Sequence, residues 1–195
     1  GDWHFVAPDW AGYGLSAQRL SYSLYEYVAD LHALIETLSP DAPARVVAHS
    51  MGANIATLLA GALPERVSAL VNMEGLTPLG GAAELPVNKR LSRWLVGQRK
   101  PRHGTVYTDH VALAQRLQSG NARLSHAKAT FLAQHLGKVT PDGDVQLALD
   151  FKVYYSVPLF PHVEQILQCW GQITAPVLFV LGEESRVLRA YRGHE

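Results

Sequence analysis

Hydrophobic positions along this chain follow two different periods, and their succession predicts strands separated by helices. Apolar residues three and four positions apart predict a helix over 24–38, which begins after Ser23 as N-cap and ends before Pro40. A second helical pattern runs over 51–63. Short continuous apolar runs predict strands at 4–7, 45–49, 68–73 and 175–182, and the run at 45–49 fits a strand covered on both faces, as in a parallel sheet.

Between residues 76 and 171 the pattern changes, and we expect helices without a clear buried strand. The helical segments are 85–96, 107–118, 124–136 and 163–170, with a turn at 140–144. The fold class is therefore α/β: a mostly parallel sheet with helices on both faces and an inserted helical cap. The predicted boundaries are 1–75 for the first part of the core, 76–171 for the cap, and 172–195 for the rest of the core.

The strand at 45–49 leads directly into Ser50, and small residues stand on both sides of this serine. Ala48 and Gly52 make the segment a variant of the G-x-S-x-G strand-to-helix turn, with alanine in place of the first glycine. Such a turn exposes Ser50 Oγ as a nucleophile and places the N–H of Met51 where an oxyanion would form. A chance match between a buried strand and a buried helix is the alternative interpretation.

A second motif precedes the serine by about three dozen residues, because Asp9, Gly12, Gly14 and Ser16 form D-x-x-G-x-G-x-S after an apolar run. In this order the two motifs resemble the α/β-hydrolase family. Segments 113–117, 120–125 and 173–178 are similar to its serine hydrolase-like branch. The resemblance implies Ser50 as nucleophile and Met51 as one oxyanion-hole amide.

The resemblance also implies an oxyanion loop before residue 1 and a catalytic histidine after a further strand beyond the one at 175–182, and the chain contains neither. His194 follows residue 182 without an intervening strand, so we reject it as the base. We therefore expect the chain to be incomplete at both ends, as an internal part of a protein of roughly 270 to 300 residues.

The acid of the expected triad has three candidates. Glu74 directly follows the strand at 68–73, whereas Glu183 and Glu184 follow the strand at 175–182. The resemblance places the usual acid at the position of Ser185, and some cap-bearing relatives carry it at the position of Glu74. We prefer Glu74 and keep Glu183 and Glu184 as alternatives. Surface carboxylates without a catalytic role are the competing interpretation of all three.

His49 is not the base, because it neighbours Ser50 in a strand and its side chain faces away. We expect His49, Trp10 and Trp94 to contact the substrate in a mainly apolar pocket of small-molecule size, with ordinary packing as the alternative. A serine nucleophile attacks an acyl carbon, which predicts hydrolysis of an ester, thioester, lactone or amide, or of a C–C bond next to a carbonyl. A binding protein with this fold and little or no turnover is the second hypothesis.

Charge balance, residue spacing and cysteine count argue against several other functions. Lys and Arg together number 17, as do Asp and Glu, so no charge excess indicates a nucleic-acid partner. The basic run that includes Arg90, Arg93 and Arg99 is interpreted as a solvated helix face.

No His, Cys and Asp cluster has metal-ligand spacing, so we expect neither a metal nor a cofactor. No apolar run is long enough to span a bilayer, and the single cysteine, Cys169, favours a reducing, cytoplasmic location. The oligomeric state stays open.

Overall fold

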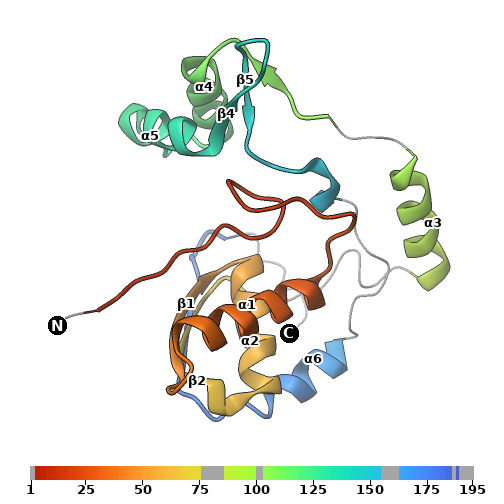
Figure 1. Ribbon diagram of the computed structural model, residues 1–195, viewed down its shortest axis with the longest axis vertical. Helices are drawn as coiled ribbons and strands as arrows, with labels where there is room; N and C mark the ends of the chain where they lie inside the picture. The colour runs from red at the N-terminus through yellow and green to blue at the C-terminus, as the bar shows by residue number, and fades with distance from the viewer. Residues whose placement is uncertain (1–2, 76–85, 100–102, 155–162, 186–187, 189–195) are drawn as a thin grey trace. The chain divides into compact units, whose positions relative to one another are not determined.

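A computed structural model of the chain describes residues 3–75, 86–99, 103–154, 163–185 and 188 (Figure 1). These residues fall into two units. Unit 1 comprises Gly1–Tyr22 and Val96–Ser156, and unit 2 comprises Ser23–Leu95 and Val157–Glu195. Helix α3 (Val87–Gln98) crosses the boundary between them. The core and cap boundaries at 75/76 and 171/172 stay predictions from the sequence.

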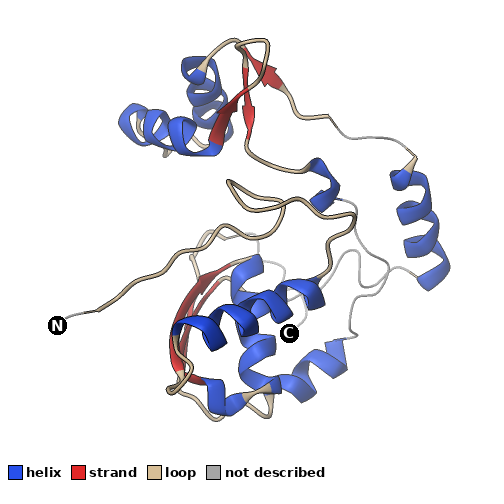
Figure 2. Ribbon diagram, in the orientation of Figure 1, coloured by secondary structure: helices blue, strands red, loops and turns tan. Residues whose placement is uncertain are grey.

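Unit 2 contains a parallel sheet, drawn in red in Figure 2, whose strands end at one edge. The strand order is β1-β2-β6, and the register pairs His49 with Met73 and Met73 with Val180. These strands confirm three of the runs predicted from apolar character. Their bounds are β1 Ala44–His49, β2 Val67–Met73 and β6 Val177–Val180.

One helix forms the centre of unit 2. Helix α2 (Met51–Ala62) packs on β1 and β2, and helices α1 (Leu24–Leu38) and α6 (Val163–Trp170) pack on α2 (Figure 1). Because α2 is surrounded in this way, every residue from 55 to 61 is buried. A short 3-10 helix, η1 (Pro64–Arg66), leads from α2 into β2. The N-cap predicted for α1 is confirmed, since Ser23 Oγ accepts a hydrogen bond from Glu26 N at 3.2 Å.

Strand β1 does not have the two buried faces that its apolar sequence predicts. Its residues alternate between half-buried and exposed, and the side chain of Val47 is 66% exposed. Alternation of this kind means that the described residues bury one face of the strand and leave the other in solvent. The buried face is the one on which α2 lies.

Unit 1 contains an antiparallel sheet that the sequence analysis did not predict. Its order is β3-β5-β4, with β3 Val106–Tyr107, β4 Gly137–Val139 and β5 Val145–Leu147. The expectation of helices alone between 76 and 171 is therefore wrong for this part. Strands of two or three residues are too short to show an alternating pattern. The turn predicted at 140–144 is confirmed, because Thr140 N donates to Asp144 O at 2.7 Å.

Two helices pack against this small sheet. They are α4 (His110–Gly120) and α5 (His126–Leu136), and both lie close to the segments predicted as helical. Apolar side chains from both helices and from β5 form one buried cluster: Leu113, Ala114, Ala129, Ala133 and Val145. Unit 1 therefore has a hydrophobic core of its own.

The strand predicted at 4–7 is wrong. Residues 3–10 have no regular secondary structure, and the side chain of Phe5 is 82% exposed. A strand needs a neighbour for its backbone hydrogen bonds. None of the strands in the described residues pairs with this segment.

Residues 9–16, which carry the D-x-x-G-x-G-x-S motif and are called the glycine loop from here on, pair with residues far along the chain. Gly14 N donates to Ala148 O at 2.8 Å, and Asp150 N donates to Gly12 O at 2.7 Å. Between them, Tyr13 and Leu149 form an antiparallel bridge. The loop is thus held by the residues that follow β5.

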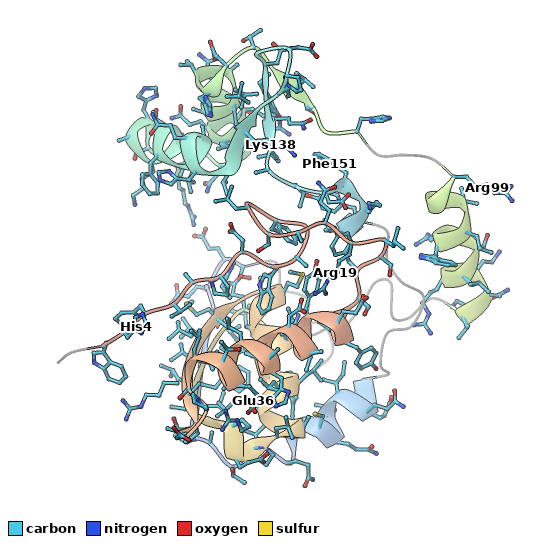
Figure 3. All side chains as sticks on the ribbon, in the orientation of Figure 1. His4, Arg19, Glu36, Arg99, Lys138 and Phe151 are labelled. Carbon is cyan, nitrogen blue, oxygen red and sulfur yellow. The ribbon has the colours of Figure 1, made fainter. Side chains whose placement is uncertain are left out.

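A buried polar cluster closes the same loop. The Tyr22 hydroxyl donates to Asp150 Oδ2 at 2.7 Å, and Lys152, in the 3-10 helix η3 (Phe151–Tyr154), forms an ion pair with Asp150 at 3.1 Å. Lys152 Nζ also donates to the backbone oxygen of Arg19, a residue labelled in Figure 3. Burial alone would raise the pKa of Asp150, but the Tyr22 hydroxyl and Lys152 hold this pKa below its usual value.

No helix in the described part of the chain is long and apolar enough to cross a membrane.

Candidate active site

Ser50 occupies the turn between β1 and α2. Its backbone has φ 51° and ψ −120°, which lies outside the regions that L-residues favour. The turn is held on both sides, since Ser50 N donates to Met73 O at 2.8 Å and Ser50 O accepts from Asn54 N at 3.1 Å. The residue is exposed, and its side chain makes no capping hydrogen bond to the helix. Ser50 Oγ is therefore presented to solvent at the carboxyl edge of the sheet.

The start of α2 provides hydrogen-bond donors beside this serine. The first N–H groups of an α-helix have no partner within the helix, and they lie at the positive end of its dipole. Met51 is the first residue of α2, so its N–H belongs to this set. An oxygen that gains negative charge during attack by Ser50 would be stabilised by such donors.

Glu74 stands at the equivalent place on the neighbouring strand. It directly follows β2, has φ 58°, and donates its N–H to Val180 O at 3.0 Å. Its carboxylate atom Oε1 accepts a hydrogen bond from Gly182 N at 3.0 Å. This N–H and, next, the Ser185 side chain lower the pKa of Glu74, with a smaller contribution from nearby His49. The carboxylate is thus kept ionised and tied to the end of β6.

The alternative acids, Glu183 and Glu184, lie on the turn that Glu74 binds. Ser185 N donates to Gly182 O at 3.0 Å and closes this turn, and both glutamates are exposed. Glu74 contacts the first and last residues of the turn, whereas the two glutamates lie between them. The geometry favours Glu74 as the acid, and its role stays a prediction.

The other predicted site residues fall into two groups. His49 ends β1 as an exposed residue and lies near enough to Glu74 to influence its pKa. Trp94 is half-buried on α3, and Trp10 is half-buried in unit 1, where its backbone oxygen accepts from Tyr13 N at 2.9 Å. Contact of His49, Trp94 and Trp10 with substrate stays a prediction. His194 lies outside the described residues.

The residues that support Glu74 were not predicted from the sequence. Asn72 and Thr57 are both fully buried, and their side chains are joined by a hydrogen bond of 2.8 Å. Asn72 also bonds both polar backbone atoms of Gly75. A polar residue within the apolar run of β2 was a signal for such a role, because a buried amide needs partners. Ser185 gave no signal beyond standing where an acid was expected.

The strand-to-helix turn at Ser50, the parallel sheet and the helix behind it match the alpha/beta hydrolase fold, whose family profile covers residues 2–194. The chain belongs to the alpha/beta hydrolase fold family. A "Serine hydrolase-like protein" from Danio rerio is 28% identical over 194 aligned residues, which is 94% of this chain and 58% of the relative. The chain thus spans somewhat more than half of this curated relative's length.

Solved structures with the hydrolase fold superpose well on the chain. A hypothetical protein from Pseudomonas aeruginosa PAO1 is 29% identical with a TM-score of 0.79, covering 94% of this chain and 68% of its own. The thioesterase domain from the curacin biosynthetic pathway is 28% identical with a TM-score of 0.77, covering 91% and 64%. A second curated relative, Lipase LipV from Mycobacterium tuberculosis (strain ATCC 25618 / H37Rv), is 37% identical over 77 residues, 40% of this chain and 29% of the relative.

Proposed function

We propose that the chain carries the nucleophile, the acid and one oxyanion donor of a serine hydrolase that cleaves an acyl bond. Ser50 is the nucleophile, Glu74 is the acid that orients the catalytic base, and the N–H of Met51 binds the oxyanion. The substrate is a small, largely apolar molecule with an ester, thioester, lactone or amide bond. The family, a thioesterase domain and a serine hydrolase-like relative support this class.

The reaction proceeds in two halves. Ser50 Oγ attacks the carbonyl carbon while its proton passes to the base, and the carbonyl oxygen becomes an oxyanion beside the Met51 N–H. The intermediate collapses to an acyl-Ser50 ester as the leaving group takes the proton. Water then attacks the ester while the base takes its proton, and the carboxylic acid product is released as Ser50 is restored. The base is a histidine that we do not assign to any described residue.

The observation that carries the proposal is the pairing of Ser50 and Glu74 at the ends of adjacent strands. His49 and Met73 are register partners, so the two following residues lie side by side at the sheet edge. Neighbouring strands are about 4.8 Å apart. A base that reaches Ser50 Oγ can therefore also meet a carboxylate from β2, as the order serine, acid, histidine requires.

A fluorophosphonate probe, which reacts with activated serines, tests the proposal on the full-length protein. We expect the probe on Ser50 by mass spectrometry, no labelling in Ser50→Ala, and retained labelling in Ser119→Ala, which alters an exposed serine on α4. Glu74→Gln should slow labelling on the order of 10²- to 10⁴-fold, as loss of a triad acid does. Glu183→Gln and Glu184→Gln should change it less than twofold.

Other outcomes would point elsewhere. Slow labelling in Glu183→Gln or Glu184→Gln, with normal labelling in Glu74→Gln, would transfer the acid role to that residue. If the folded full-length protein binds small acyl ligands and Ser50 resists the probe, the chain is a binding protein of this fold and the proposal is wrong.

A further inference from the structure

A buried amide lies directly beneath the Glu74 turn. Asn72 is fully buried on β2 and points to α2, where its Nδ2 donates to Thr57 Oγ1 at 2.8 Å. The same Nδ2 donates to Gly75 O at 3.2 Å, and Oδ1 accepts from Gly75 N at 2.8 Å. The Asn72 side chain thus forms hydrogen bonds with both polar backbone atoms of Gly75, the residue that follows Glu74.

Thr57 connects this amide to the helix that begins at Ser50. It lies about two turns along α2, is fully buried, and donates its hydroxyl hydrogen to Ala53 O at 2.7 Å. Since this hydrogen is used within the helix, the hydroxyl accepts from Asn72. That direction also fixes the amide orientation, with Nδ2 toward Thr57 and Oδ1 toward Gly75 N.

Packing holds the same turn from the helix side. A Cβ atom on Gly75 would lie 2.3 Å from Ala53 Cβ and 2.7 Å from Asn72 Oδ1, so the backbone after Glu74 touches the first turn of α2. Ala53 itself is fully buried. The Glu74–Gly75 peptide is therefore confined between helix α2 and the Asn72 amide.

The Asn72 amide has two effects at this place. It gives hydrogen-bond partners to the N–H and C=O of buried Gly75, which would otherwise lose them at a cost in stability. A fully bonded buried network also fixes one geometry against others. Here the geometry that it fixes is the left-handed turn at Glu74.

We propose that Asn72 is a positioning residue, which acts with Thr57 to lock the Glu74 turn onto helix α2 and so hold the acid at a set distance from Ser50. The inference rests on the proposed role of Glu74 as the acid. Asn72 touches neither substrate nor reacting atoms, and its effect on the reaction passes through the Glu74 carboxylate.

The test measures the rate of Ser50 labelling by a fluorophosphonate at saturating probe, well below each variant's Tm. Asn72→Leu should slow this step by about 10- to 100-fold, as small displacements of catalytic groups do. Thr57→Val removes the link from Asn72 to α2, together with the bond from Thr57 to Ala53 O, and should slow labelling by a smaller factor, about 3- to 10-fold. Thr57→Ser keeps the hydroxyl and should restore the rate to near that of the unaltered protein.

A matched control separates this role from general helix stability. Thr37, exposed on α1, donates its hydroxyl to Ala33 O at 2.8 Å, the same bond that Thr57 makes within α2. Thr37→Val should therefore leave labelling unchanged. If Thr37→Val and Thr57→Val slow labelling equally, the link from Thr57 to Asn72 has no specific role and the inference is wrong.

Double variants show whether the effect passes through the acid. In a Glu74→Gln background, Asn72→Leu and Thr57→Val should cause no further loss of labelling rate. The carboxylate that Asn72 and Thr57 position is already absent in this background. Fully multiplicative losses would contradict the inference. If Glu74→Gln itself does not slow labelling, the acid assignment fails instead, and the two failures are thus distinguishable.

A readout without catalysis tests the lock directly. The titration of the Glu74 carboxyl carbon, followed by NMR, should have its midpoint below the usual range in the unaltered protein. In Asn72→Leu the carboxylate loses its fixed approach to Gly182 N, so the midpoint should rise. An unchanged midpoint in Asn72→Leu would show that the turn keeps its place without the amide, and would overturn the inference.

Discussion

The residues that follow β1 and β2 share a positive φ and hold their side chains in two different ways. Ser50 and Glu74 each follow a parallel strand, and among the described residues they are the non-glycine positions with positive φ. Each donates its N–H to the last residue of the next strand, Met73 for Ser50 and Val180 for Glu74. After Ser50 a helix begins at once, whereas after Glu74 comes a buried glycine.

This difference shows how each side chain is held. The Ser50 turn is supported by the backbone of α2, which leaves the hydroxyl unused and exposed. At the Glu74 turn, side-chain hydrogen bonds from Asn72 hold the backbone of the next residue, Gly75, and Gly182 N holds the Glu74 carboxylate. The proposed nucleophile is placed by secondary structure, and the proposed acid is placed by specific polar contacts. The acid should therefore be the more easily displaced of the two.

Moving the carboxylate from the end of β2 to the end of β6 should give the largest effect. Ser185 hydrogen bonds to Glu74, so an aspartate at 185 would place a carboxylate in the same neighbourhood. We expect Glu74→Gln with Ser185→Asp to regain at least about tenfold of the labelling rate that Glu74→Gln loses, because the base needs a nearby negative charge rather than one particular strand.

The uncharged counterpart, Glu74→Gln with Ser185→Asn, is the control and should regain nothing. Equal rates in the two double variants would show that a carboxylate at 185 cannot take over from Glu74.

Adding a methyl group to Gly75 should disturb the acid turn and leave the serine turn alone. The new Cβ would lie 2.3 Å from Ala53 Cβ, so Gly75→Ala forces the turn away from α2. We expect a loss of about 1–3 kcal/mol in the free energy of unfolding, measured with urea. Gly120→Ala, whose Cβ would meet only Arg116 Nη1 at 3.5 Å, should change it by less than about 0.5 kcal/mol.

Relieving the backbone strain at Ser50 and at Glu74 should give the smallest changes in the free energy of unfolding, and the two changes should differ. Ser50→Gly removes the cost of a strained conformation, about 1–3 kcal/mol, less the extra entropy of glycine in the unfolded chain. We expect a net gain near 1 kcal/mol by urea unfolding, with labelling abolished. Glu74→Gly gains similarly but loses the bond from Gly182 N, so its stability should stay near that of the unaltered protein. A clear gain in Glu74→Gly would mean that this bond contributes little.

The sequence predicted the features that depend on neighbouring residues. The serine turn follows from small residues at 48 and 52 next to an apolar run, and Glu74 was recognised because it directly follows such a run. Both signals are local, and the structure places both residues at the same edge of the sheet.

Features that depend on distant residues were not predictable in this way. The bond from Asn72 to Thr57 exists because α2 lies on β2, and the bond from Gly182 to Glu74 spans 108 positions. The strands of unit 1 contain too few residues to show a period. Residues 4–7 had the apolar character of a strand, yet the described strands offer them no partner.

The pairing of the glycine loop with residues 148–150 affects the order in which the chain folds. Tyr22 and Asp150 are 128 positions apart, and closing so long a loop costs entropy before any contact forms. The β1–α2–β2 segment, 44–73, is contiguous and has no such delay. During synthesis residues 9–22 leave the ribosome before residues 148–152, so they acquire these partners only after Lys152 has emerged. Contacts of such high contact order form slowly, so the glycine loop should be among the last parts of unit 1 to gain protection from hydrogen exchange during refolding.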